Sequence, residues 1–296
     1  MENVPSSARE RSFYTDFSLI SENGRDETTV FPVHKLILIL HSLYFQTFFE
    51  AEMNKDKQSM VIVDGSPHSV DIFISFIYKN TMNLDDLQPS LNTLKEVIIL
   101  AHQYMVQPLI TEIITYCVKI LSPLNSIDLY EFSCIFENDP VNLRVLQEEC
   151  IKRLLIDGTV LKTEAFLKSK VKTIRALLSD DDCSWNEEEI WGAVVNWCKY
   201  KCKMESAPQT SSNIRSKLEE GGILSLIKFG SFSKTGFLEG PAKSNILNRE
   251  EINYVKDILD GVWVIDGDIN LDTSTRSRRR CTCGMWAQGV WHVCDH

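Results

Sequence analysis

The stretch FPVHKLILILHSLYFQTFFEAEMNK, residues 31–55, carries the pattern that decides the first half of the fold. It begins with β-prone residues, and the pattern changes at His34. Apolar residues then recur near helical spacing: Leu36, Ile37, Leu40, Leu43, Tyr44 and Phe48. This spacing predicts one or two short helices that end at about Met53.

The residues before this stretch predict a β-hairpin. FSLIS at residues 17–21 and TTVFPV at residues 28–33 are both β-prone, and the polar segment ENGRDE lies between them. Because Asn23-Gly24 is a favoured turn pair, we expect a hairpin whose loop is longer than two residues.

The residues after it predict a strand and a helix. MVIVDG at residues 60–65 is typical of a short buried strand. Ser66 can then cap a helix whose first residue is Pro67, where a missing N–H costs nothing. One apolar face follows at helical spacing: Val70, Phe73, Ile74, Ile77 and Tyr78.

Two more helices complete this unit. A loop from Asn80 to about Ser90 precedes a helix whose apolar face is Leu94, Val97, Ile98 and Ala101. Gln107-Pro108 then starts a helix that runs to Leu121. The order of hairpin, helices, strand and helices predicts a compact α/β unit that ends near Leu121.

The second half predicts an all-helical domain. Ser126 is expected to cap a helix over 127–136, and Asp139-Pro140 to open a longer one. Asn186 precedes three glutamates, which favour the positive end of a helix dipole. The polar residues 204–216 predict a mobile loop, and a helical pair is expected around 224–232 and 249–259.

Composition narrows the class of function. At 296 residues, two domains are the default expectation. The net charge of −10 argues against direct nucleic-acid binding, and no apolar run is long enough to span a membrane. Nine cysteines and a start without an apolar leader favour reduced thiols, so we expect a cytoplasmic protein, with the nucleus as a second compartment.

Three separated segments between Asp16 and Leu121 resemble BTB/POZ domains. They are residues 31–55, the strand and helix VIVDGSPHSVDIFISFIYKNTMNL, and the closing pair VIILAHQYMVQPLITEIITYCVKIL. Phe166 to Cys198 resembles the BACK domain, and GGILSLIKFGSF and SNILNREEINYV resemble BTB-BACK proteins that end in a PHR β-sandwich. The residues after Leu259 are too few for that sandwich, so we expect it to be lost or absent from this form of the chain.

The resemblance implies an α+β protein in two parts. Residues 1–13 are expected to be a flexible N-terminus and 14–121 the BTB/POZ domain, a small sheet with helices. Residues 122–260 are then an all-α BACK-like domain, and 261–296 a tail with a basic run and a Cys/His cluster.

The resemblance also implies dimerisation and binding to cullin-3. The family's cullin-binding φ-x-E element falls on Met53, Asn54 and Lys55, with Tyr78 as a further candidate contact. Lys55 reverses the sign of the third position, which should lose a bond worth roughly 1.5–3 kcal/mol unless Glu52 or Asp56 substitutes. The charged pair of the family's dimer cleft falls on Asp16 and Lys35. The aromatic and apolar side chains at helical spacing, Phe17, Leu38, Phe45, Phe48 and Tyr78, are more typical of core.

The sequence contains no recognisable catalytic motif and implies no cofactor. His34 has no catalytic partner at useful spacing, so we interpret it as a hydrogen-bonded structural histidine. Cys198 and Cys202 are four residues apart without further ligands nearby, which favours buried thiols.

The tail offers five soft metal donors: Cys281, Cys283, His292, Cys294 and His296. Zinc would accept such donors, but the spacing is uncommon, so we predict no metal and keep zinc as an alternative. The arginines at 276 and 278–280 fit either a localisation signal or an exposed run, and Trp286 and Trp291 suggest that the tail packs on something.

These observations predict a non-enzymatic, homodimerising adaptor that recruits an unidentified target to a cullin-3 RING ubiquitin ligase. The alternative is a BTB scaffold or transcriptional co-regulator that does not bind cullin. Lys55 and the basic tail favour the alternative.

Overall fold

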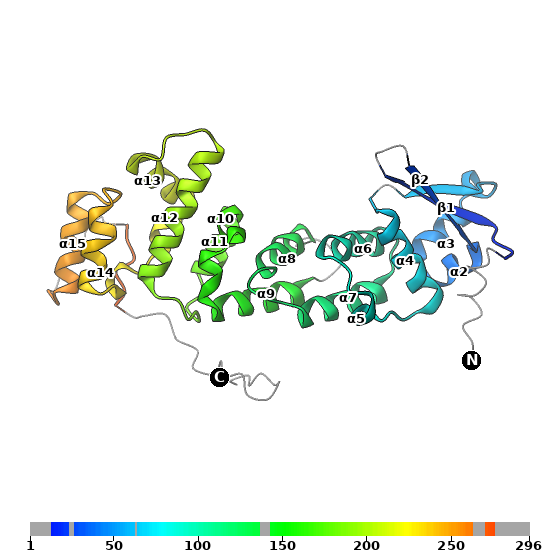
Figure 1. The fold of residues 1–296 in the computed structure, drawn as a ribbon, viewed down its shortest axis with the longest axis horizontal. Coiled ribbons are helices and arrows are strands. Elements are labelled where there is room, and N and C mark those ends of the chain that lie inside the picture. The colour runs from blue at the N-terminus through cyan, green and yellow to red at the C-terminus, as the bar shows by residue number, and fades with distance from the viewer. Residues whose placement is uncertain (1–12, 24–26, 63, 137–142, 263–269, 276–296) are drawn as a thin grey trace, which may run out of the picture. The chain divides into compact units, whose positions relative to one another are not determined.

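The computed structural model describes residues 13–23, 27–62, 64–136, 143–262 and 270–275. They form two compact units: the first runs to Ile120 and also includes Leu143, and the second comprises the other described residues from Leu121 onward. The first unit is blue to cyan in Figure 1 and the second green to orange. Among the described residues, every helix is too short or too polar to span a membrane.

The first unit contains a three-stranded sheet. β1 (Phe17–Asn23) pairs antiparallel with β2 (Glu27–Val33), and β3 (Ser59–Ile62) adds to β1 in parallel, giving the order β2-β1-β3. The predicted hairpin and strand are therefore confirmed. Phe17, Leu19 and Ser21 point to the buried face of β1, as the two-residue period of a strand requires.

Helices make up the rest of the first unit, most of them at positions that the sequence predicts. They are α2 (Lys35–His41), α3 (Leu43–Glu50), the 3-10 turn η1 (Glu52–Asn54), α4 (Pro67–Lys79), α5 (Leu84–Leu87), α6 (Leu91–Gln103) and α7 (Gln107–Lys119). Ser66 caps α4 by accepting a hydrogen bond from the Ser69 amide, with Pro67 as the first helical residue. The expected loop over 80–90 is partly wrong, because Asn83 accepts a bond from the Asp86 amide and starts the short helix α5.

The core of the first unit lies around α4, which contacts β1, α2 and α6. Leu19, Leu38, Phe45, Phe73 and Ile98 are fully buried there. Burying each such side chain stabilises the fold by about 1.5–3 kcal/mol. Leu38 and Phe45 belong to the segment that opens the sequence analysis, so that segment anchors the unit.

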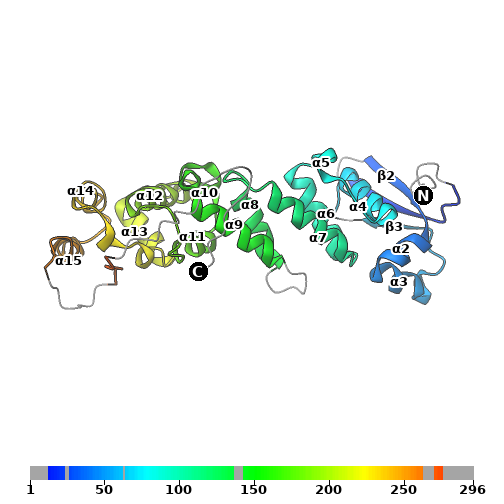
Figure 2. The same cartoon turned by 90° about the horizontal axis from the view of Figure 1, so that it is seen from below.

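The second unit is helical apart from one isolated β-bridge among its described residues. Its elements are α8 (Ser126–Ser133), η2 (Cys134–Phe136), α9 (Arg144–Ile156), η3 (Gly158–Lys162), α10 (Glu164–Lys168), α11 (Val171–Leu178), α12 (Glu187–Met204), α13 (Ser211–Glu220), η4 (Leu224–Leu226), η5 (Phe229–Ser231), α14 (Lys234–Glu239), η6 (Pro241–Lys243) and α15 (Arg249–Leu259). Figures 1 and 2 both show α8 and α9 side by side. The predicted all-α domain is confirmed.

The core of this unit gathers on α12. Ile190, Val194 and Trp197 are buried on one face of the helix, as their spacing predicts. Asn186 caps the helix by accepting a hydrogen bond from the Glu189 amide. The Trp197 indole N–H donates to the Ser169 carbonyl at 3.0 Å, so this buried polar group is satisfied.

Three details differ from the sequence predictions. Ser126 is the first residue of α8 and not its cap, since its hydroxyl donates to the Ser122 carbonyl at 2.7 Å. The expected loop over 204–216 is partly wrong, because α13 begins at Ser211. The expected helix over 224–232 consists of the two 3-10 turns η4 and η5.

Several expectations lie outside the described residues. They concern residues 1–12, the helix start at Asp139-Pro140, the arginine run, the two tail tryptophans and the Cys/His cluster.

Candidate protein-interaction surfaces

Three leucines on consecutive helices are exposed to solvent. Leu36 and Leu40 lie one turn apart on α2 and are 65% and 67% exposed, and Leu43, at the start of α3, is 61% exposed. Leu38 on the same short helix is fully buried. We call Leu36, Leu40 and Leu43 the leucine surface. A helix that is apolar on several sides needs cover on more than one of them. The apolar run KLILILH in the sequence therefore already indicated that part of this helix would be an exposed apolar surface.

The predicted dimer-cleft pair lies at the start of α2. One Asp16 carboxylate oxygen accepts a hydrogen bond from the Lys35 backbone N–H at 2.7 Å, a favourable place for an anion at a helix N-terminus. The Lys35 ammonium lies 5.6 Å from the ring centroid of Phe17 and 5.4 Å from that of Phe49. The structure therefore brings Asp16 and Lys35 together through the backbone, while the lysine side chain rests on aromatic rings.

Tyr78 and His34 form a hydrogen-bonded pair. The Tyr78 hydroxyl accepts a bond from the His34 backbone N–H at 2.9 Å and lies 2.7 Å from Nδ1 of the same histidine. The other ring nitrogen of His34 lies 2.9 Å from the Phe13 carbonyl oxygen. His34 is thus a hydrogen-bonded structural residue, as expected. Tyr78 is only 5% exposed, so little of its side chain is accessible to a partner.

The segment that aligns with the φ-x-E element forms η1 and its C-cap. Met53 is 84% exposed, as a residue that inserts into a partner would be. Lys55 is exposed and forms an ion pair with Glu52. Asn54, in contrast, is buried, and its side-chain amide donates to the Phe48 carbonyl at 3.0 Å. Of the three predicted residues, Met53 and Lys55 face solvent and Asn54 holds the turn.

The paired thiols on α12 are buried. Cys198 and Cys202 are both inaccessible, and burial raises the pKa of the Cys198 thiol to about 12. Both thiols are therefore part of the core, as their spacing without further ligands favours. The described residues include no cluster of three metal-binding side chains.

The first unit is thus a small sheet with helices, two of which expose apolar side chains, and the second unit is helical. The family model for the BTB/POZ domain matches residues 6–121. The model described as "BTB And C-terminal Kelch", the BACK domain, matches residues 136–225. The chain belongs to the BTB-BACK family, whose domains mediate contacts between proteins.

Curated relatives match across both domains. BTB/POZ domain-containing protein 6 of Xenopus laevis is 26% identical over 227 residues, which are 76% of this chain and 40% of the relative. BTB/POZ domain-containing protein 3 of Homo sapiens is 25% identical over 227 residues, 76% of this chain and 41% of the relative. The match therefore spans about two fifths of the length of these relatives.

Proposed function

We propose that this chain is a non-enzymatic adaptor that pairs with a second copy of itself and recruits a target protein to a cullin-3 RING ubiquitin ligase. The leucine surface is the observation that carries the proposal. The pairing joins two first units, and Met53 with its neighbours forms the contact with cullin-3. Cys117, Cys198 and Cys202 are buried free thiols, which supports a reducing compartment, the cytoplasm or the nucleus.

The leucine surface supports self-association. Fully burying one leucine contributes about 1.5–3 kcal/mol, so three leucines that are each more than half exposed represent a substantial driving force. A twofold pairing lets the same patch serve both copies, and this is the commonest symmetry of soluble oligomers. A dimer also presents two target sites at once, which raises the apparent affinity for a repeated target without new contacts.

The oligomeric state tests this step. The chain is expected to have the mass of two copies by light scattering at micromolar concentration, and the double variant Leu36→Ser, Leu40→Ser the mass of one. Leu87→Ser is the matched control, because Leu87 on α5 is 50% exposed and lies outside the leucine surface. A single chain for the wild type, or a dimer that survives the double variant, would refute pairing through this surface.

The exposed end of η1 supports a contact with cullin-3. Met53 offers an apolar side chain with almost no intramolecular cover. The sign of Lys55 opposes a site built for a carboxylate, yet its exposed ion pair with Glu52 is worth at most about 1 kcal/mol and rearranges readily. Glu52 can then supply the missing negative charge.

Binding to the N-terminal region of cullin-3 tests this step. We expect the wild type to bind, Met53→Asp to bind at least about tenfold more weakly, and Lys55→Glu to bind about tenfold more tightly. Lys57→Glu is the control, because it makes the same reversal of charge at an exposed position two residues further on.

The second candidate function is a dimerising scaffold or co-regulator that does not bind cullin, and the exposed Lys55 favours it. If Lys55→Glu bound the cullin-3 region and the wild type did not, the result would support this candidate and refute the adaptor proposal.

A further inference from the structure

A short segment near the end of the described chain lies along the second unit. Residues 271–274, here called the strap, pair with Lys228 through a parallel β-bridge at Asp272. The Asp272 carbonyl accepts a hydrogen bond from the Phe229 N–H at 2.8 Å. Leu271 packs against the core of the unit, and the Ser274 N–H donates to the Asp272 carboxylate at 2.9 Å. The strap is therefore held by an apolar anchor and by backbone pairing.

Gly230 makes room for the strap. A Cβ atom at this position would lie 2.1 Å from the Thr273 carbonyl oxygen and 2.9 Å from that of Ser274. Both atoms belong to the backbone, so no side-chain rotation could relieve the clash. The approach of the two backbones therefore depends on glycine at position 230.

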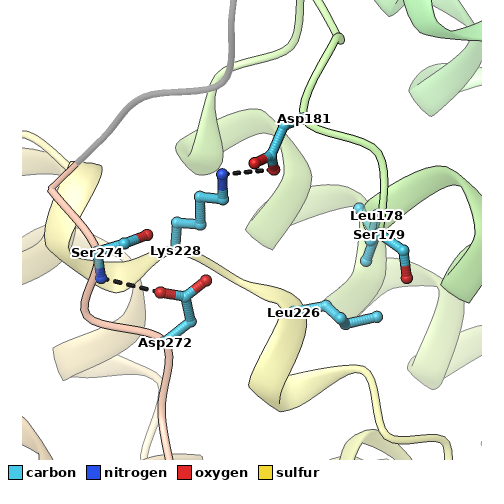
Figure 3. Close-up of a pocket in the computed structure, with 7 residues that line it drawn as sticks. All are labelled: Leu178, Ser179, Asp181, Leu226, Lys228, Asp272 and Ser274. Carbon is cyan, nitrogen blue, oxygen red and sulfur yellow. Dashed lines mark hydrogen bonds and ion pairs between the residues drawn. The ribbon is translucent and has the colours of Figure 1, made fainter.

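Polar groups hold Lys228, the residue that pairs with the strap. The Lys228 N–H donates to the Glu187 carboxylate at 3.1 Å, and the Lys228 ammonium, although the residue is only 8% exposed, pairs with Asp181 at 2.5 Å. Asp272 and Ser274 of the strap line a pocket of about 290 Å³ together with Lys228. Figure 3 shows the two strap residues beside Lys228. Leu178 and Leu226 form the apolar part of its lining. The strap thus completes one wall of this pocket.

We propose that Lys228 to Gly230 form a docking slot for an extended peptide, and that the strap of the same chain occupies it in cis. The slot selects an apolar residue first, which packs on the core, and an extended backbone after it, whose carbonyl groups lie against Gly230. Seated in this way, the strap makes the chain that continues from residue 275 leave the second unit at one fixed point. A group carried by the residues that follow is then tethered to the second unit by a short segment of chain. A short tether raises the local concentration of that group at the surface of the unit.

Hydrogen exchange of the Phe229 amide in the full chain tests the proposal. In Gly230→Ala this amide is expected to exchange about tenfold faster or more, because its bond to Asp272 is lost and the remaining bond to the Ile227 carbonyl closes only a three-residue turn. Gly192→Ala is the matched control, since a Cβ at Gly192 meets no atom within 4 Å. Equal exchange rates in the wild type and in Gly230→Ala, with α12 still protected in both, would overturn the proposal.

A second variant covers the case in which Gly230→Ala unfolds the unit. Replacing Leu271, Asp272 and Thr273 by Gly-Ser-Gly leaves the slot intact and should speed the exchange of the Phe229 amide without affecting α15. A peptide with the sequence of residues 270–275 should then restore slow exchange in this variant and leave the wild type unchanged. No change in Phe229 exchange on replacing the strap, or no effect of the peptide on the variant, contradicts a docking slot.

Discussion

At the scale of single residues, the ion pair between Arg215 and Glu251 joins two helices of the second unit. Two guanidinium nitrogens of Arg215 each donate to a Glu251 carboxylate oxygen at 2.7 Å. Glu251 also accepts a bond from the Asn248 N–H at 2.8 Å, which closes a capping box at the start of α15. Because Glu251 is 7% exposed, its charge depends on these donors.

Removing the arginine should destabilise the second unit. In Arg215→Met the Glu251 carboxylate would stay buried without its main partner, so we expect a loss of about 2–3 kcal/mol in the free energy of unfolding, measured with denaturant. Glu219→Gln is the control, because Glu219 is an exposed partner of the same arginine and should cost about 0.5 kcal/mol or less. Equal losses in the two variants would contradict a dominant role for Glu251.

The same pair predicts a dependence on pH. Burial by itself would raise the pKa of Glu251, but the hydrogen bonds from Arg215 and Asn248 outweigh it, and the pKa lies below the ordinary value of 4.5. A carboxyl group with a lowered pKa stabilises the fold fully above its unfolded value and loses that contribution as the pH falls through the folded value. The stability difference between the wild type and Glu251→Gln should therefore be constant near neutral pH and shrink below pH 4.5. A difference that persists unchanged in acid would contradict this assignment.

At the scale of elements, α13 is a helix that the spacing of apolar residues in the sequence did not predict. Its sequence is mostly polar, and only Ile214 and Leu218, four residues apart, are buried. The Thr210 hydroxyl accepts a bond from the Asn213 N–H at 3.2 Å and caps the helix. The composition of this segment is typical of a loop. The burial of two side chains and the hydrogen bond of one cap make it a helix.

The cap can be tested by itself. Thr210→Ala should destabilise the second unit by about 1 kcal/mol, because the Asn213 N–H loses its acceptor. Ser212→Ala changes an exposed residue in the same turn and should have an effect within about 0.5 kcal/mol of zero. Urea titrations of both variants measure the difference, and the absence of any effect from Thr210→Ala would mean that the cap does not stabilise α13.

At the scale of the whole molecule, the two units have separate cores. We therefore expect calorimetry to resolve two thermal transitions, with Arg215→Met lowering one and Ile98→Val, a core change in the first unit, lowering the other by several degrees. A single transition that moves with both variants would show that the units unfold as one.

The predicted cullin-binding residues show which features of a site a sequence pattern does not determine. The alignment of the φ-x-E element is a statement about order along the chain, and in the structure Met53 and Lys55 face solvent. It could not tell that Asn54 faces inward to the Phe48 carbonyl or that the Tyr78 hydroxyl, on a side chain expected in the core, bonds to His34. Those orientations depend on neighbours that fold against the segment from elsewhere.

The sequence by itself determined the elements whose causes lie within a few consecutive residues: the hairpin, the helix starts at Ser66-Pro67 and Asn186, the apolar faces and the membership of the BTB-BACK family. Only the tertiary structure decided which leucines of α2 and α3 stay exposed, that β3 joins β1 in parallel, and that residues 271–274 return to Gly230. The physical reason is that burial and close backbone approach are properties of pairs of segments. No local pattern contains the distance between them.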